Sequence, residues 1–263
     1  MKTIRTYGAP PFKVAVIHGG PGTGGEMAPV ARQVARRQGV LEPIQTATSL
    51  EGQVAELRAA LEDWGDPPMV LIGFSWGAWL SFITAAGHPA LVSKLILVGS
   101  GPFEEAYVSQ LREIRMSRLS PEDRKAFDAT VKALRDPQTE DKDADLARLG
   151  SLARKADAYD PITDRSDEAE RIGPRADVFQ GVWHEAARLR RRGDLLELGG
   201  EIACPVVAIH GDHDPHPAEG VREPLAAVLE RFRFVPLERC GHTPWIERQA
   251  RAAFFRVLDE ELS

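Results

Sequence analysis

The sequence predicts an α/β fold in which a mostly parallel sheet carries helices on both faces and an all-helical segment is inserted between two strands. Short apolar runs alternate with stretches of helical spacing, a rhythm typical of strand–helix units in a parallel sheet. Several runs are apolar throughout, as strands buried on both faces are. The rhythm stops after Gly99 and resumes at Cys204–Pro205, and this interruption predicts the insertion.

Six apolar runs predict the strands of the sheet. In chain order they are 13–18, 40–45, 69–74, 95–99, 206–210 and 232–237. Stretches with helical spacing predict four helices around them, at 27–38, 50–64, 76–87 and 218–231. Thr48 and Glu51 have the spacing of a capping box, which indicates that the helix over 50–64 begins beside them.

The inserted segment is helical, charged and interrupted by turns. Ser120 followed by Pro121 predicts a helix start, with Ser as the cap and Pro at the first helical position. The charged stretch 137–145 and the arginine-rich run 188–192 are interpreted as solvated surface. We therefore assign 1–100 and 201–263 to the core and 101–200 to the helical insertion.

Composition limits the partners. The chain has 263 residues, 43% of them hydrophobic, which is enough for a substantial core. A net charge of -6 argues against nucleic-acid or anionic-membrane partners and favours a small-molecule substrate. The first 13 residues lack the apolar run of a secretory signal, so we expect a cytoplasmic protein, a monomer or small homo-oligomer. The uncharged stretch 69–87 contains Gly73, Ser75 and Gly77, which favours a buried strand–turn–helix over a membrane span.

A candidate nucleophile lies in the sequence GFSWG, residues 73–77. This G-x-S-x-G pattern stands between an apolar strand and an amphipathic helix, which is the context that a nucleophile elbow requires. Gly73 and Gly77 supply the small residues that such a tight turn needs. The hydroxyl of Ser75 is then exposed at the carboxyl edge of the sheet, with the helix N-terminus behind it to favour developing negative charge.

The glycine-rich stretch IHGGPGTGGE, residues 17–26, has two interpretations. Gly20 and Gly25 have the spacing of a phosphate-binding loop, but Glu26 and Met27 stand where that motif needs Lys and Ser or Thr. A carboxylate there would repel phosphate. The other interpretation is that the glycines bring backbone N–H groups close to a reacting atom.

A serine nucleophile needs a base, and a histidine after the last strand could supply it. His242 lies in the sequence CGHTP just after the run 232–237. His18, His88 and His184 compete with it, and each is interpreted as structural.

The base needs a carboxylate to orient it. Asp212 and Asp214 both follow the preceding strand, and the residues alone leave the choice between them open. Three histidines in the same loop, His210, His213 and His216, suggest a metal, but the prolines between and after them break the helix that would align them. We expect no metal and no organic cofactor.

The chain order Ser75, Asp, His242, the elbow and the HGGP loop at 18–21 together resemble the α/β-hydrolase superfamily, over essentially all of the chain outside the insertion. In that family the acid lies in a G-x-x-D pattern, which maps onto Gly211 and Asp214 and selects Asp214. The resemblance also implies that 101–200 is a cap over the site.

More narrowly, HGGPG at 18–22 together with SWG at 75–77 is similar to proline iminopeptidases and their esterase-like relatives. Those peptidases hold a substrate ammonium with acids of the cap, for which Glu104, Glu105 and Glu185 are candidates by composition. Little sequence precedes the first predicted strand, so the family's leading strands should be shortened or missing.

The resemblance implies a serine hydrolase that cleaves a small ester or amide through an acyl-enzyme. Backbone N–H groups of Gly20 and Trp76 would form the oxyanion hole. Aromatic side chains are candidates for an apolar acyl pocket: Phe74, Trp76, Trp183 and Trp245.

Other functions remain open. They are a proline iminopeptidase-like aminopeptidase, a catalytically silent receptor or scaffold, and a cofactor-free haloperoxidase-like or C–C bond hydrolase. Dehalogenase and epoxide-hydrolase chemistry is disfavoured, because those relatives carry Asp as the nucleophile.

The two cysteines are predicted to be free thiols. Cys204 precedes one strand and Cys240 follows its parallel neighbour, so they should lie at opposite edges of the sheet. Five or six strand residues separate those edges by more than the roughly 7 Å between Cα atoms that a disulfide allows.

Overall fold

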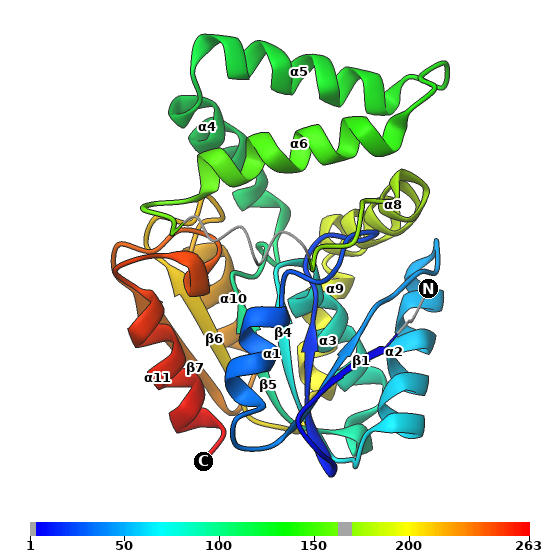
Figure 1. Cartoon of the computed structure of the whole chain (residues 1–263), viewed down its shortest axis with the longest axis vertical. Coiled ribbons are helices and arrows are strands. Elements are labelled where there is room, and N and C mark those ends of the chain that lie inside the picture. The colour runs from blue at the N-terminus through cyan, green and yellow to red at the C-terminus, as the bar shows by residue number, and fades with distance from the viewer. Residues whose placement is uncertain (1–3, 163–169) are drawn as a thin grey trace.

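The computed structural model, which describes residues 4–162 and 170–263, has a seven-stranded sheet at its centre (Figure 1). The strand order is β1-β3-β2-β4-β5-β6-β7, and all neighbours are parallel except β1 and β3. The strands are β1 Ile4–Tyr7, β2 Phe12–Ile17, β3 Gly39–Pro43, β4 Met69–Phe74, β5 Val92–Val98, β6 Val206–Gly211 and β7 Phe232–Leu237. The predicted mostly parallel sheet is confirmed.

Helices cover both faces of the sheet, as predicted. Along β2, Val14 and Val16 face one layer while Ala15 and Ile17 face the other, because successive side chains of a strand alternate. One layer contains α1 Ala28–Val34 and α11 Arg251–Glu261. The other contains α2 Leu50–Trp64, α3 Trp76–Gly87 and α10 Glu219–Val228. Each layer has its own buried apolar cluster against the sheet.

The first strand was not predicted. β1 is only four residues long, lies at the sheet edge and pairs antiparallel with β3, with Tyr7 opposite Val40. Its sequence IRTY has one exposed and three half-buried residues, so it lacks the continuous apolar run that marks the inner strands. One shortened leading strand is therefore present.

The described parts of the segment between β5 and β6 are mostly helical, and residues 163–169 of the predicted insertion lie outside the described residues. Its longer helices are α4 Val108–Arg118, α5 Pro121–Arg135, α6 Lys142–Asp157 and α8 Ala176–Arg192. The short helix α9, Asp194–Glu197, follows α8. Ser120 caps α5 as predicted, since its side chain accepts a hydrogen bond from Asp123 N and Pro121 is the first helical residue. In Figure 1, α4, α5 and α6 lie beyond the carboxyl ends of the strands.

The predicted capping box at α2 is wrong by one residue. Ser49, not Thr48, is the N-cap, and its hydroxyl accepts from Gly52 N at 3.1 Å. Glu51 then stands one position too early to reach back to the cap. The helix itself begins at Leu50, where the spacing placed it.

Two further expectations concern the cysteines and the uncharged stretch 69–87. Cys204 and Cys240 are both free thiols, as predicted. The uncharged stretch 69–87 divides into β4 and α3, and within the described part of the chain no helix is long and apolar enough to cross a membrane.

Candidate active site

Ser75 occupies a strained turn between β4 and α3. Its φ of 53° and ψ of -112° lie in a region that side chains other than glycine rarely adopt. Ser75 N donates to Val98 O at 2.9 Å, which ties the turn to β5. A Cβ on Gly73 would lie 2.3 Å from Gly77 O, and a Cβ on Gly77 would lie 2.3 Å from Ile17 O. Both glycines are therefore required for the close passage of the backbone.

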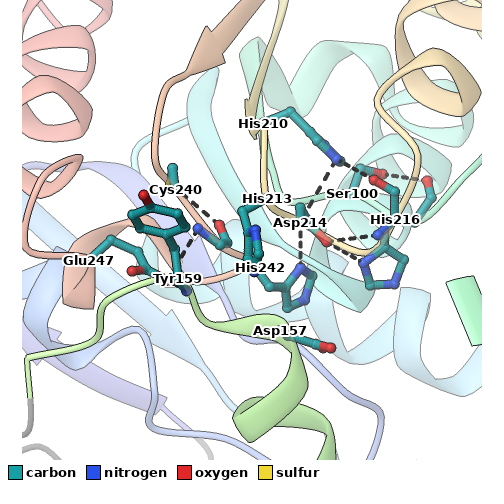
Figure 2. Close-up of polar contacts among 12 residues, drawn as sticks. Ser100, Asp157, Tyr159, His210, His213, Asp214, His216, Cys240, His242 and Glu247 are labelled. Carbon is teal, nitrogen blue, oxygen red and sulfur yellow. Dashed lines mark hydrogen bonds and ion pairs between the residues drawn. The ribbon is translucent and has the colours of Figure 1, made fainter. Parts of the chain in front are cut away.

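Asp214 and His242 meet at the carboxyl edge of the sheet. They follow β6 and β7, which are parallel neighbours with Gly211 opposite Leu237, so the loops after both strands emerge together. His242 Nδ1 donates to Asp214 Oδ2 at 2.7 Å, and the Asp214 side chain is fully buried. This hydrogen bond occupies Nδ1 of His242, and Nε2 has no hydrogen-bond partner within the described part of the chain (Figure 2).

The pair shifts the pKa of both groups. Burial opposes ionisation of Asp214, but the neighbouring imidazoles, His242 foremost, hold its pKa well below the usual range. Burial would likewise lower the pKa of His242, but the Asp214 carboxylate outweighs it and raises that pKa above its ordinary value. Asp214 therefore stays ionised and stabilises an imidazolium at His242.

Ser75 lies at the same edge as this pair. The ring of Phe74, the preceding residue, is 4.8 Å from the His242 ring. A Cβ on Gly99, just after β5, would lie 3.1 Å from His242 Nδ1. Within the described residues the Ser75 hydroxyl makes no hydrogen bond to His242. Such bonds are often long without substrate and tighten when it binds.

The competing residues have other partners. Asp212 is exposed, and its Oδ1 accepts from Cys240 N at 3.1 Å. His18 is buried, with Nδ1 donating to Gly19 O at 2.8 Å and Nε2 accepting from Gln45 N at 3.3 Å. The structure thus places Asp214, rather than Asp212, beside His242.

The glycine-rich loop is held in a folded turn. Gly20 has a φ of 47°, and its carbonyl accepts from Thr23 N at 3.2 Å. Gly19 N donates to the Glu26 carboxylate at 2.6 Å, a contact that the sequence did not reveal. Gly20 N has no hydrogen-bond partner among the described residues, and Trp76 N belongs to the first turn of α3, where N–H groups lack intrahelical partners. Both N–H groups stay candidates for an oxyanion hole.

The aromatic pocket candidates occupy different environments. Phe74 and Trp245 are buried and contact each other edge-on, with ring centroids 4.7 Å apart. Trp76 is also buried, and its ring nitrogen lies 3.4 Å from Gln53 Oε1. Trp183, on α8, is 37% exposed and stacks on Trp79 at 5.8 Å. Phe74 therefore packs against both His242 and Trp245, whereas Trp183 contacts α3.

The acidic candidates for binding a substrate ammonium are mostly engaged elsewhere. Glu105 pairs with Arg190 at 2.9 Å. Glu185 accepts from Leu50 N at 2.7 Å. Glu104 is exposed. The ion pair at Glu105 and the backbone contact at Glu185 count against a role for these two carboxylates in holding an ammonium group.

The helical segment contacts the His242 loop, and no sequence pattern predicts this contact. The buried carboxylate of Glu247 accepts from Tyr159 N at 2.9 Å, Asp160 N at 2.7 Å and Gly241 N at 3.1 Å. His242 N donates to Asp157 O at 2.9 Å, at the end of α6. The helical segment therefore contacts the candidate site directly (Figure 2).

Asp214, His216 and His242 offer ligand atoms within 4.8 Å of one another. Both histidines already bond to Asp214 through Nδ1, at 2.8 Å from His216 and 2.7 Å from His242. These hydrogen bonds account for the cluster without a metal ion.

Comparison with known proteins agrees with this architecture. A family model described as the alpha/beta hydrolase fold matches residues 14–249. Monoacylglycerol lipase abhd6-B of Xenopus laevis is 26% identical over 211 residues, which cover 78% of this chain and 59% of that protein. The chain thus matches about three-fifths of the length of this curated relative.

Two solved structures share the fold at low sequence identity. The crystal structure of VinJ has a TM-score of 0.72 at 18% identity, over 98% of this chain and 93% of that one. Proline iminopeptidase of Mycobacterium smegmatis has a TM-score of 0.63 at 17% identity, over 98% and 93%. Since the family model spans most of the sequence and the sheet order and elbow fit it, the chain belongs to the α/β hydrolase fold family.

Proposed function

We propose that the protein is a serine hydrolase that cleaves a small carboxylic ester or amide through an acyl-enzyme on Ser75. The hydrogen bond between His242 Nδ1 and Asp214 Oδ2, beside the strained turn that carries Ser75, is the observation that carries the proposal. Membership of the α/β hydrolase fold family and the similarity to a monoacylglycerol lipase support it.

In this mechanism His242 Nε2 takes the Ser75 proton while Ser75 Oγ attacks the substrate carbonyl. Asp214 holds the imidazole by Nδ1 and stabilises the imidazolium that forms. The N–H groups of Gly20 and Trp76 stabilise the oxyanion, and removing one such donor typically costs about 10²–10³ in rate. His242 then protonates the leaving group and activates a water that hydrolyses the acyl-enzyme.

The proposed cap is the helical segment 101–200. Its link to the His242 loop through Glu247 and Asp157 supports a role at the site. The expected small-molecule substrate, the cytoplasmic location and a monomer or small homo-oligomer stay predictions.

The second candidate is an aminopeptidase similar to proline iminopeptidases. The HGGPG loop and the fold shared with the M. smegmatis enzyme favour it. The pairing of Glu105 with Arg190 weighs against it, because that carboxylate already has a cationic partner. We therefore rank an esterase first.

A substrate screen tests the proposal. We expect the protein to hydrolyse p-nitrophenyl esters of short to medium chain length and to leave proline and alanine arylamides intact. Ser75→Ala should lower kcat by about 10⁴ or more, because the nucleophile is lost. Ser81→Ala is the matched control, since Ser81 lies on the same helix and its hydroxyl has no partner among the described residues.

Two outcomes would overturn the proposal. Cleavage of arylamides with a free amine, without ester cleavage, would establish the aminopeptidase instead. Full esterase activity in Ser75→Ala would exclude Ser75 as the nucleophile.

A further inference from the structure

Asp214 is held from two sides by two histidines. His242 binds Oδ2 at 2.7 Å, whereas His216 binds Oδ1 twice, through ring Nδ1 at 2.8 Å and through its backbone N at 2.9 Å. Figure 2 shows dashed lines from Asp214 to both rings. Among the described residues, His216 therefore supplies two of the three hydrogen bonds to this buried carboxylate, and the mechanism above uses neither.

His216 is itself fixed in place. His210 Nε2 donates to His216 O at 2.8 Å, and prolines at 215 and 217 restrict the backbone on both sides. The side chain is buried, with its ring 4.6 Å from the His242 ring. The ring is thus presented to Asp214 by a rigid loop.

The His216 ring acts as a neutral donor. Its Nδ1 faces a carboxylate oxygen, which accepts a hydrogen bond only from a protonated nitrogen. Burial lowers the pKa of His216 to about 4, although Asp214 opposes this shift. The ring therefore carries one proton, on Nδ1, across the neutral pH range.

We propose that His216 is a positioning residue for the Asp214 carboxylate: its Nδ1–H fixes Asp214 Oδ1, so that Oδ2 stays aligned with His242. The donor also disperses part of the carboxylate charge and thereby limits how strongly Asp214 attracts a proton to His242. The rate effects of this inference rest on the proposed function, whereas its effect on the His242 pKa does not.

Several charged and titratable groups face this cluster and are common to all the variants below. His210 Nε2 lies 3.8 Å from Asp214 Oδ2. From α4, the charge of Arg118 interacts electrostatically with Asp214. The charge of Arg115 interacts in the same way with His216 and His242 and lowers the pKa of both. Asp157, at the end of α6, is paired with Arg115 at 2.6 Å. Because none of these groups changes between the variants, a shift in the pKa of His242 reports the loss of the His216 Nδ1–H donor.

The test compares His216→Asn with His216→Leu. The two side chains have nearly the same shape, but only the Asn amide nitrogen can donate from the position of Nδ1. We expect kcat/KM for an ester to fall about 10- to 100-fold in the Leu variant, the range for losing a hydrogen bond to a charged group. The Asn variant should recover most of that loss.

The pH profile separates positioning from a merely structural role. Without the donor, Asp214 attracts a proton to His242 more strongly and raises its pKa, so the acid limb of kcat/KM should move to higher pH in His216→Leu. In His216→Asn the acid limb of kcat/KM should stay at the wild-type pH. His213→Leu is the control in the same loop, since the His213 ring contacts Tyr159 at 5.2 Å rather than Asp214.

NMR titration of 13C-labelled histidine measures the His242 pKa without any substrate, so the inference can be tested even if no ester is cleaved. A higher His242 pKa in His216→Leu and a wild-type value in His216→Asn would support it. An unchanged pKa and kcat/KM in a folded Leu variant, or equal losses in both variants, would overturn it. If the Leu variant does not fold, His216→Phe keeps the ring volume without the donor and is judged by the same outcomes.

Discussion

Asp214 is the residue at which the loops after β6 and β7 converge. It is ionised, fully buried and bonded to His242, so the acid–base behaviour of the site depends on it. Its carboxylate raises the pKa of His242, and the proposed role of His242 as a general base requires a neutral ring. Wild-type kcat/KM should therefore fall as the pH drops through this raised pKa.

Asp214→Asn tests this dependence. The amide cannot stabilise the imidazolium, so the pKa of His242 should drop and the acid limb of kcat/KM should move to lower pH. In serine proteases the corresponding change lowers kcat by about 10⁴, and we expect a loss of that order. Asp212→Asn is the control, because Asp212 contacts Cys240 N instead. An acid limb that does not move would show that another group governs His242.

At the scale of single residues, the sequence identifies site residues that directly follow strands. It does not identify those whose contacts depend on how a loop folds. Ser75, Asp214 and His242 each follow a strand at the same sheet edge, and β6 and β7 are neighbours, so strand order brings Asp214 and His242 together. Glu26 and His216 were interpreted only as an obstacle to phosphate and as a possible metal ligand. Their contacts with Gly19 N and with Asp214 depend on loop closure, which no spacing encodes.

At the scale of elements, apolar periodicity locates the buried elements and local polar contacts decide their ends. β4, α2 and α3 have the predicted bounds because their apolar residues define them. β1 was missed because an edge strand buries little. The N-cap of α2 was misplaced because Thr48 and Ser49 are adjacent and either could cap a helix.

Two single substitutions test the observed cap of α2. Ser49→Ala removes the acceptor for Gly52 N and should lower the free energy of unfolding by about 1 kcal/mol. Thr48→Ala should leave it unchanged within about 0.5 kcal/mol, because Thr48 is exposed and is not the cap. Urea denaturation measures both. A larger loss in Thr48→Ala than in Ser49→Ala would show that Thr48, rather than Ser49, caps the helix.

At the scale of the molecule, the helical segment and the core meet at the His242 loop. The change of rhythm after Gly99 predicted a helical segment, but not that the end of α6 would bond to His242 N or that Glu247 would accept three backbone N–H groups there. The contacts of Tyr159 and Asp160 with Glu247, and of Asp157 with His242, join segments more than 80 residues apart and so arise from tertiary packing. They join the proposed cap to the loop that carries His242, the proposed base.

The most direct test of the central claim is the site of covalent modification by a fluorophosphonate. Mass spectrometry of the digested protein should find one adduct, on Ser75, and none in Ser75→Ala. His242→Ala should react far more slowly, because the serine loses its base. Labelling that persists in Ser75→Ala, or folded wild-type protein that does not react, would contradict the account.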